Sequence, residues 1–151
     1  MPQSLSQVYL HLVFSTKGRA PLLIDAVRGE LHRYMAGVLK NLGCHAVLVN
    51  SMEDHVHILL TLSRTVSVSD MVEEVKTSSS KWLKKQAGMP HDFAWQSGFG
   101  VFSVSASNLL DVEKYVACQQ EHHQRRSFQE EFLLLLKKYG VEYDERYLWD
   151  G

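Results

Sequence analysis

The sequence predicts an α+β protein built on an antiparallel β-sheet. Short apolar runs of strand type are separated by two long segments of helical period, and more helices follow. The second and third runs are joined by only four residues, Ser51-Met52-Glu53-Asp54. A link this short favours a hairpin, because a parallel crossover needs a dozen residues or more. The order strand, helix, strand, strand, helix, strand is that of a ferredoxin-like split βαβ sheet, with both helices on one face.

The first half of the chain supplies three of these strands and one helix. A strand is expected at residues 8–14, where apolar residues alternate along the chain. A helix is expected at residues 22–42, where apolar residues recur every three or four positions and Gly43 provides a stop. Two further strands are expected at residues 44–50 and at about residues 54–62.

The second half of the chain supplies the fourth strand and the remaining helices. The expected elements are a helix capped by Ser67 or Ser69 and reaching about Gln86, a strand over Phe93–Ser105 interrupted at Gly98 and Gly100, a helix capped by Ser107 or Asn108 and reaching about Arg126, and a helix from Ser127 to Tyr139. Ser127 is expected to cap the last helix because Glu130 follows three residues later. The tail, residues 141–151, is rich in aromatic residues and is expected to dock on the rest of the protein.

Composition predicts one ordinary globular domain over residues 1–151, with a core at about residues 5–126 and a C-terminal helix and tail at 127–151. Hydrophobic residues make up 45% of the chain and charged residues 22%, which excludes a disordered protein. No run approaches the roughly 18 apolar residues of a membrane span, and no secretory signal is expected. Cys44 and Cys118 are isolated and suit free thiols in the cytoplasm, although a disulfide between them stays open.

The net charge of −1 argues against a protein that coats nucleic acid without specificity. Local basic patches remain compatible with this charge. Lys17 and Arg19 form one such group, and Lys76 and Lys81 lie in another. A solvated surface is the alternative for each group.

The most informative segment is Asp54-His55-Val56-His57-Ile58-Leu59-Leu60. Within a strand, residues two apart point to the same face, so His55 and His57 are expected to lie side by side, about 7 Å apart at the backbone. Two imidazoles at this spacing are able to bind one metal ion. The alternative is a partly exposed face of the sheet that happens to carry histidines. In either case the apolar residues between them would face the two helices, and the histidine face would need a cover from a late helix or a second subunit.

Tyr115 and Gln119 are four residues apart on the helix expected after Ser107, so they are neighbours on one helix face. Both lie at the edge of the apolar stripe of that helix and are expected to be partly buried. A tyrosine at such a boundary is often purely structural. A glutamine there needs a partner for its amide, and a metal ion bound through the carbonyl oxygen is one possibility.

Two imidazoles and one amide oxygen would leave open positions on a divalent cation, as a catalytic metal requires. Mixed nitrogen and oxygen ligands suit Mg²⁺ or Mn²⁺ when phosphate oxygens complete the shell. Tyr115 is then a candidate nucleophile, because a nearby cation makes its phenol, of ordinary pKa about 10, easier to deprotonate. A phosphodiester fits as the target. The covalent phosphotyrosine would keep the bond energy, so no nucleotide cofactor is expected.

Three segments resemble the single-tyrosine HUH transposases of the IS200/IS605 type, including their REP-associated relatives. Tyr9–Lys17 resembles the opening strand of that family, and Asp54–His57 resembles its histidine-hydrophobic-histidine signature. Lys114–Gln119 resembles its catalytic helix, with a glutamine four residues after the tyrosine. The histidine pair by itself is a weak motif. Together with the tyrosine and glutamine, in this element order, it is specific.

The resemblance implies that His55, His57 and Gln119 bind a divalent metal ion, and that Tyr115 attacks single-stranded DNA. The products would be a 5′-phosphotyrosine and a free 3′-hydroxyl. Lys17, Arg19, Lys76 and Lys81 would then be the candidates for contacts with the DNA phosphates. The family recognises DNA hairpins near the ends of mobile elements and works as a homodimer with composite active sites, in which the tyrosine helix of one subunit covers the histidines of the other. Two alternatives remain: a domesticated nucleic-acid-binding regulator without transposition activity, and another HUH endonuclease such as a replication initiator, although those tend to be larger.

Overall fold

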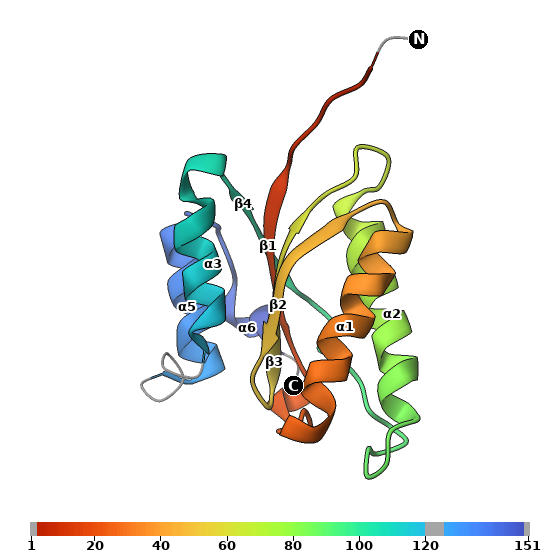
Figure 1. Ribbon diagram of the computed structural model, residues 1–151. Helices are drawn as coiled ribbons and strands as arrows, with labels where there is room; N and C mark the ends of the chain where they lie inside the picture. The colour runs from red at the N-terminus through yellow and green to blue at the C-terminus, as the bar shows by residue number, and fades with distance from the viewer. Residues whose placement is uncertain (1–2, 120–125, 150–151) are drawn as a thin grey trace.

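A four-stranded antiparallel sheet forms the centre of the computed structural model, which describes residues 3–119 and 126–149 (Figure 1). The strands follow the order β2-β3-β1-β4. Their bounds are β1 Tyr9–Ser15, β2 His45–Ser51, β3 His55–Thr61 and β4 Gly100–Val104. The two central strands, β1 and β3, are neighbours although a helix and a strand separate them in the sequence, which confirms the predicted split βαβ arrangement.

The short link between β2 and β3 forms the predicted hairpin. Asn50 pairs with His57 and Ser51 with Val56, and the backbone amide of Met52 donates to the carbonyl oxygen of His55 at 3.0 Å. This register sets the face of every β3 side chain, because a slip of one residue would turn each of them to the opposite side of the sheet.

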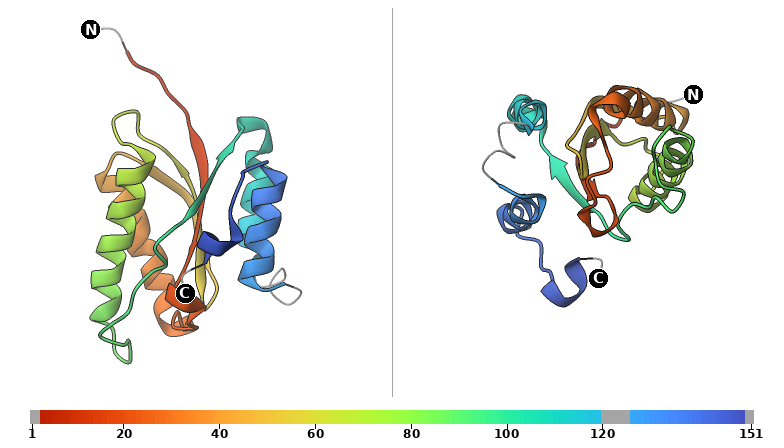
Figure 2. Two further views of the ribbon diagram at one scale, coloured as in Figure 1. Left: turned by 180° about the vertical axis from the view of Figure 1, so that it is seen from behind. Right: turned by 90° about the horizontal axis from the view of Figure 1, so that it is seen from below.

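Helices α1 (Asp25–Asn41) and α2 (Val68–Lys84) cover one face of the sheet, as Figure 2 shows. The side chain of Ser67 accepts a hydrogen bond from the amide of Asp70, so the predicted cap is Ser67 and not Ser69. Alternate β3 residues point into this layer and are fully buried with apolar residues of β1 and both helices. The buried cluster includes Leu12, Phe14, Leu31, Met35, Val56, Ile58, Leu60, Met71 and Val75.

Helices α3 (Leu109–Ala117) and α5 (Phe128–Lys138) cover the opposite face (Figure 2). A late helix of the same chain therefore supplies the cover that the histidine face was expected to need. The apolar cluster here is much smaller than the one beneath α1 and α2. Its buried members are Val13, Phe102, Phe128, Phe132, Leu135 and Leu136. The predicted cap of α5 is confirmed, because the side chain of Ser127 accepts a hydrogen bond from the amide of Glu130.

Two predicted elements are shorter than expected. The strand predicted over Phe93–Ser105 begins only at Gly100, because the preceding segment is fastened to other parts of the chain. The Lys76 ammonium donates to the carbonyl oxygens of Gln96 and Gly98 at 2.8 and 2.6 Å, and Trp95 forms an isolated bridge with Thr16. These contacts direct the backbone of residues 95–98 away from a regular ladder.

The helix predicted to reach about Arg126 ends at Ala117 instead. Cys118 leaves the helical conformation with ψ at 29°, while its amide still donates to the carbonyl oxygen of Lys114. The rest of the predicted helix falls on residues 120–125, which lie outside the described residues. Cys44 and Cys118, both among the described residues, are free thiols as predicted.

The tail is docked in part, through the short helix α6 (Glu145–Leu148) and Trp149. Trp149 packs edge-on against Phe128 and Phe132 of α5, and the Arg19 guanidinium lies 5.7 Å above its ring. Tyr147, in contrast, is 80% exposed, so the expected docking does not extend to it.

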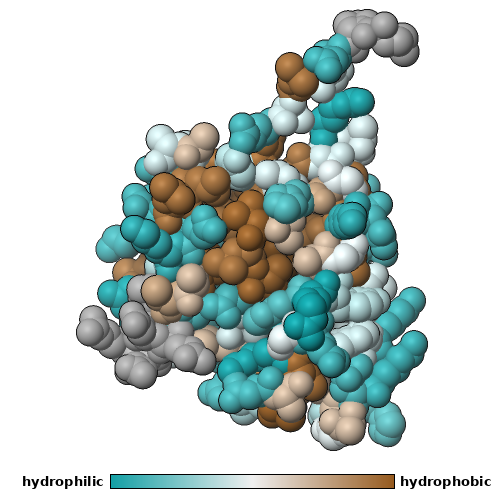
Figure 3. Space-filling view, in the orientation of Figure 1, coloured by the Kyte–Doolittle hydropathy of each residue, from teal (hydrophilic) through white to brown (hydrophobic). Residues whose placement is uncertain are grey.

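The outer surface along edge strand β2 carries apolar residues, gathered between α3 and α1 in the middle of the view in Figure 3. Five consecutive residues of β2, from Ala46 to Asn50, are half-buried rather than fully covered. Among the described residues, no helix has both the length and the apolar character to cross a membrane.

Candidate active site

His55 and His57 lie at the start of β3 and point to the face covered by α3 and α5. Strand alternation places them there, while Val56 between them points to the opposite face. Their ring centroids are 5.2 Å apart, and both side chains are completely buried. The predicted pairing of the two histidines on one face is confirmed. The alternative of a partly exposed histidine face is wrong, because the two C-terminal helices close over it.

A buried carboxylate, Glu131 of α5, meets both imidazoles. Its Oε1 atom lies 2.9 Å from Nε2 of His57 and 3.5 Å from Nε2 of His55. Only 2% of Glu131 is exposed. A carboxylate in such a position needs charged or hydrogen-bonded partners, because an unpaired buried charge is strongly destabilising. The three side chains offer ligand atoms within 4.8 Å of one another, as a group that holds a metal ion would.

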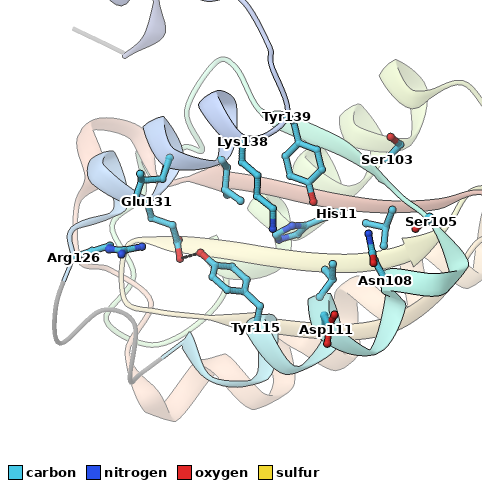
Figure 4. A pocket seen from close by; sticks show the side chains of 14 residues that line it. His11, Ser103, Ser105, Asn108, Asp111, Tyr115, Arg126, Glu131, Lys138 and Tyr139 are labelled. Atoms are coloured by element: carbon cyan, nitrogen blue, oxygen red, sulfur yellow. Dashed lines mark hydrogen bonds between the residues drawn. The ribbon is translucent and has the colours of Figure 1, made fainter.

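Tyr115 of α3 completes this cluster from the other side. Its hydroxyl group donates a hydrogen bond to Oε2 of Glu131, as Figure 4 shows. Its ring centroid lies 6.0 Å from that of His57. The predicted nucleophile and the predicted metal-binding histidines therefore meet within a single chain, and the two oxygens of one carboxylate connect them.

A second layer of side chains orients the two imidazoles. Nδ1 of His55 lies 2.6 Å from a carboxylate oxygen of Asp54, and Nδ1 of His57 lies 2.8 Å from Nε2 of His11 on the neighbouring strand β1. Both rings are thereby held through their Nδ1 atoms, and their Nε2 atoms are turned toward Glu131. Partners of this kind fix the ring orientation of histidines that bind metal ions.

Burial and neighbouring charges shift the protonation of this cluster. Burial, with a further contribution from His57, lowers the pKa of His11 to about 3, so the His11 ring is neutral near pH 7. Burial and then the charge of Glu131 raise the pKa of the Tyr115 hydroxyl group far above its ordinary value. Burial opposes a charge on His55, but hydrogen bonds with Asp54 and Glu131 outweigh it and raise the pKa of this imidazole. Tyr115 is thus a protonated phenol that needs help to become a nucleophile.

Gln119 is fully buried next to Tyr115. Its amide nitrogen donates to the backbone carbonyl oxygen of Tyr115 at 3.2 Å, and its hydrogen bond with the Tyr115 side chain opposes the rise of the tyrosine pKa. The amide of Asn50, on β2, donates to the carbonyl oxygen of Val116 at 2.8 Å and fastens the end of α3 to the sheet. The expected partner of the Gln119 amide is therefore in part Tyr115. Its role as a metal ligand stays a prediction.

The four residues predicted to contact DNA phosphates fall in two places. Lys17 and Arg19 lie in the short 3-10 helix η1 (Lys17–Arg19), directly after β1, whose last residue pairs with His55. Lys76 and Lys81 lie on α2, on the opposite side of the sheet from the candidate active site (Figure 2). The structure therefore brings the first pair near the histidines and separates the second pair from them.

The donor set fits a divalent first-row or magnesium ion. Two imidazoles and one carboxylate, with an amide close by, form a mixed nitrogen and oxygen set that leaves positions for substrate oxygens. These three side chains come from regular elements and are buried, so their geometry is fixed before any ligand binds.

Sequence reasoning missed Glu131 and His11. A signal for Glu131 exists, because it lies three residues after Phe128 and four before Leu135, inside the apolar stripe of α5. This signal is hidden by the neighbouring Glu130, because acidic residues are common in the first turn of a helix and Glu131 looks like a second one of that kind. His11 occupies the face of β1 that carries Val13, but a single histidine in an apolar strand gives no sign of its partner across the sheet.

Comparisons with known proteins agree with the fold. The family model described as "Transposase IS200 like" matches residues 4–119, which include both histidines, Tyr115 and Gln119. The chain therefore belongs to the IS200-like transposase family.

Three similar proteins share between 13% and 23% of their aligned residues with this chain. The ISDra2 transposase TnpA of Deinococcus radiodurans is 22% identical over 120 residues, which cover 76% of this chain and 86% of the relative. A crystal structure of a transposase-like protein from Deinococcus radiodurans R1 matches with a TM-score of 0.61 and 23% identity, over 79% of this chain and 98% of the other. A REP-associated tyrosine transposase bound to a REP hairpin matches with a TM-score of 0.62 and 13% identity, over 82% and 72%. At these identities the structural matches establish the fold.

Proposed function

We propose that this member of the transposase family cleaves and rejoins single-stranded DNA through a covalent bond to Tyr115. One observation carries the proposal: the Tyr115 hydroxyl group and both β3 imidazoles converge on one buried carboxylate, Glu131. A structural tyrosine has no need of such surroundings, and a buried carboxylate between two histidines costs more stability than an apolar residue would.

The chemistry follows from these contacts. The Tyr115 oxygen attacks the phosphorus of a phosphodiester while its proton passes to Glu131, which already accepts the hydrogen bond. The bond between phosphorus and the 3′ oxygen breaks, and that oxygen takes up the proton that Glu131 received, which leaves a 5′-phosphotyrosine and a free 3′-hydroxyl group. Attack of a 3′-hydroxyl group on the phosphotyrosine reverses the step and rejoins the strand. The bond energy is kept throughout, so the reaction requires no nucleotide cofactor.

We further propose that His55 and His57 hold Mg²⁺ or Mn²⁺ at this site, with Gln119 as the predicted third protein ligand and Glu131 as a competing one. A bound divalent cation would withdraw charge from the phosphate group under attack. Asp54 and His11 would keep the Nε2 atoms of the two imidazoles directed toward the ion.

DNA hairpins are the proposed substrates, in line with the solved REP-associated relative, which is bound to a REP hairpin. Lys17 and Arg19 are the better placed of the predicted phosphate contacts, since η1 follows the strand that pairs with His55. We also propose that residues 1–151 act as one functional unit, because Glu131 of α5 completes the cluster around Tyr115. The proposed compartment is the cytoplasm, because the proposed substrate is DNA.

The test of the nucleophile is the substitution Tyr115→Phe. Wild-type protein incubated with labelled hairpin DNA and Mn²⁺ is expected to form a covalent adduct on a denaturing gel, and Tyr115→Phe is expected to form none while still binding the hairpin. Tyr143→Phe, on the partly exposed tail, is the matched control and keeps full activity. An adduct with Tyr115→Phe would refute the assignment. Hairpin binding by wild-type protein with no adduct under any metal condition would favour the regulator alternative.

Homodimerisation with composite sites remains a proposal. In the single chain Tyr115 already faces its own His57. Mixing Tyr115→Phe with His57→Ala chains distinguishes the two arrangements. Adduct formation by the mixture shows that the tyrosine of one subunit acts with the histidines of the other. Its absence shows that each tyrosine acts with the histidines of its own chain.

The metal ligands are tested by Mn²⁺ binding, measured by electron paramagnetic resonance on the DNA-free protein. We expect His55→Ala and His57→Ala each to weaken Mn²⁺ binding by at least tenfold. Gln119→Ala and Glu131→Gln then identify the third ligand, since only the ligand's substitution should weaken binding comparably. Unchanged Mn²⁺ affinity in both histidine variants would exclude the proposed metal site.

A further inference from the structure

A cavity of about 510 Å³ opens between α3 and α5, directly beside the candidate active site (Figure 4). Tyr115 and Glu131 border one end of it, and Asn108 and Asp111 border the other. His11 of β1 lies at its floor. Cavities of several hundred cubic ångströms are typical of small-molecule sites, and this one has room for a nucleotide.

The walls of this cavity are apolar, and its ends are polar. Val112 of α3 and Leu134 and Leu135 of α5 line it. Leu134 is 45% exposed and does not belong to the apolar cluster beneath α3 and α5. A large aliphatic side chain therefore faces the open space of the cavity. A planar, partly apolar ligand with polar edges would match this distribution, because the apolar walls cover its faces while the polar residues meet its rim.

Asn108 and Asp111 supply polar side chains at one end of the cavity. Asn108 is the last residue of the short 3-10 helix η2 (Ala106–Asn108), which leads directly into α3. Its side chain is exposed and lines the cavity. Asp111, one turn further along, also lines the cavity. These two side chains present an amide and a carboxylate to whatever enters.

Positive charge lies on the remaining sides of the cavity. Lys138 of α5 extends toward His11 across the floor, and Arg126 stands near Tyr115 and Glu131 (Figure 4). The charge of Arg126 opposes the rise of the Tyr115 pKa but does not outweigh burial and Glu131. Cations beside the nucleophile and at the cavity floor suit the phosphate groups of a DNA strand that passes over Tyr115.

We propose that this cavity binds one unpaired nucleotide adjoining the phosphodiester that Tyr115 attacks, and that Asp111 selects its base. The proposal rests on the function proposed above, since a strand joined to the reacting phosphate must place its neighbouring nucleotide next to Tyr115. A carboxylate only accepts hydrogen bonds. Asp111 therefore favours adenine, cytosine or guanine, which carry an amino group, over thymine, whose one donor, the N3–H of the unpaired base, is flanked by two carbonyl oxygens that repel a carboxylate.

The test measures binding of fluorescent heptanucleotides to the full-length Tyr115→Phe protein, in which covalent capture does not occur. The probes are an all-thymidine heptamer and the same heptamer with one central dA or dC. Because an unpaired strand is free to slide, the protein selects which nucleotide enters the cavity. We expect the dA and dC probes to bind about fivefold or more tightly than the all-thymidine probe, in keeping with the energy of one good base contact.

Matched substitutions assign this preference to the cavity. Asp111→Asn is expected to remove most of the preference, whereas Glu113→Gln makes the same charge change on α3 outside the cavity and should keep it. Lys138→Ala should weaken all probes, and Lys137→Ala, one residue away and outside the cavity lining, should weaken them less. Leu134→Trp, which fills the cavity from an exposed position, should abolish the preference even if Asp111→Asn impairs folding.

Equal binding of the three probes would overturn the proposal. An equal loss of the base preference in Asp111→Asn and Glu113→Gln would overturn it as well. Wild-type protein with hairpin DNA provides the independent check. An adduct without any base preference would reject the nucleotide site and keep the proposed function. A base preference that depends on Asp111 without any adduct would keep the site and reject the strand-transfer chemistry.

Discussion

The two faces of the sheet differ in what they bury. The face beneath α1 and α2 buries an extensive apolar cluster. The face beneath α3 and α5 buries far fewer apolar residues, together with His11, His55, His57, Gln119 and Glu131. Burying polar groups contributes little stability even when all of them are paired. The comparison indicates that one face holds the fold together and the other positions the chemistry.

The largest difference between the faces should be in stability. Leu31→Ala, in α1, removes a fully buried side chain from the larger cluster and should lower the free energy of unfolding by about 2–5 kcal/mol. Leu135→Ala, in α5, should lower it by less, because Leu135 lines the open cavity and leaves a smaller unfilled space. Urea denaturation measures both. A loss for Leu135→Ala equal to that of Leu31→Ala would show that both faces support the fold equally.

A smaller effect is expected where β4 meets α5. A methyl group at Gly100 would lie 2.9 Å from Cζ of Phe132, so Gly100→Ala should cost about 1–3 kcal/mol as the ring is displaced. Gly37→Ala, in α1, meets no atom within 4 Å and should instead stabilise the protein by about 0.5–1 kcal/mol. Thermal denaturation of the two variants gives the comparison. A neutral Gly100→Ala would mean that α5 moves away at little cost.

The smallest effects on stability should separate the roles of the faces. Ser67→Ala and Ser127→Ala each remove the cap of one helix, α2 and α5 respectively, and each should cost about 1 kcal/mol. Only Ser127→Ala is expected to slow adduct formation as well, because α5 carries Glu131. Adduct rates measured well below the melting temperature test this. Equal slowing in both variants would indicate a general effect of stability and would remove the functional distinction.

Much of the fold follows from short-range patterns in the sequence. Alternation placed His55 and His57 on one face of β3 and Val56 on the other, and the four-residue link predicted the hairpin that holds the strand in register. Helical period and caps predicted α1, α2 and α5 to within a few residues. The predictions failed where long-range contacts override local preference. The ladder begins only at Gly100 because Lys76 and Thr16 hold the preceding segment, and the helix bearing Tyr115 ends at Ala117.

The sequence by itself determined which residue types were available for the chemistry and which face of its strand or helix each one occupies, because periodicity is a property of neighbouring residues. Only the tertiary structure decided that α5 returns across the sheet and brings Glu131 between Tyr115 and the two imidazoles. It also decided that His11 stands behind His57. Contacts between residues so far apart in the chain depend on how the elements pack, and no local pattern records that packing.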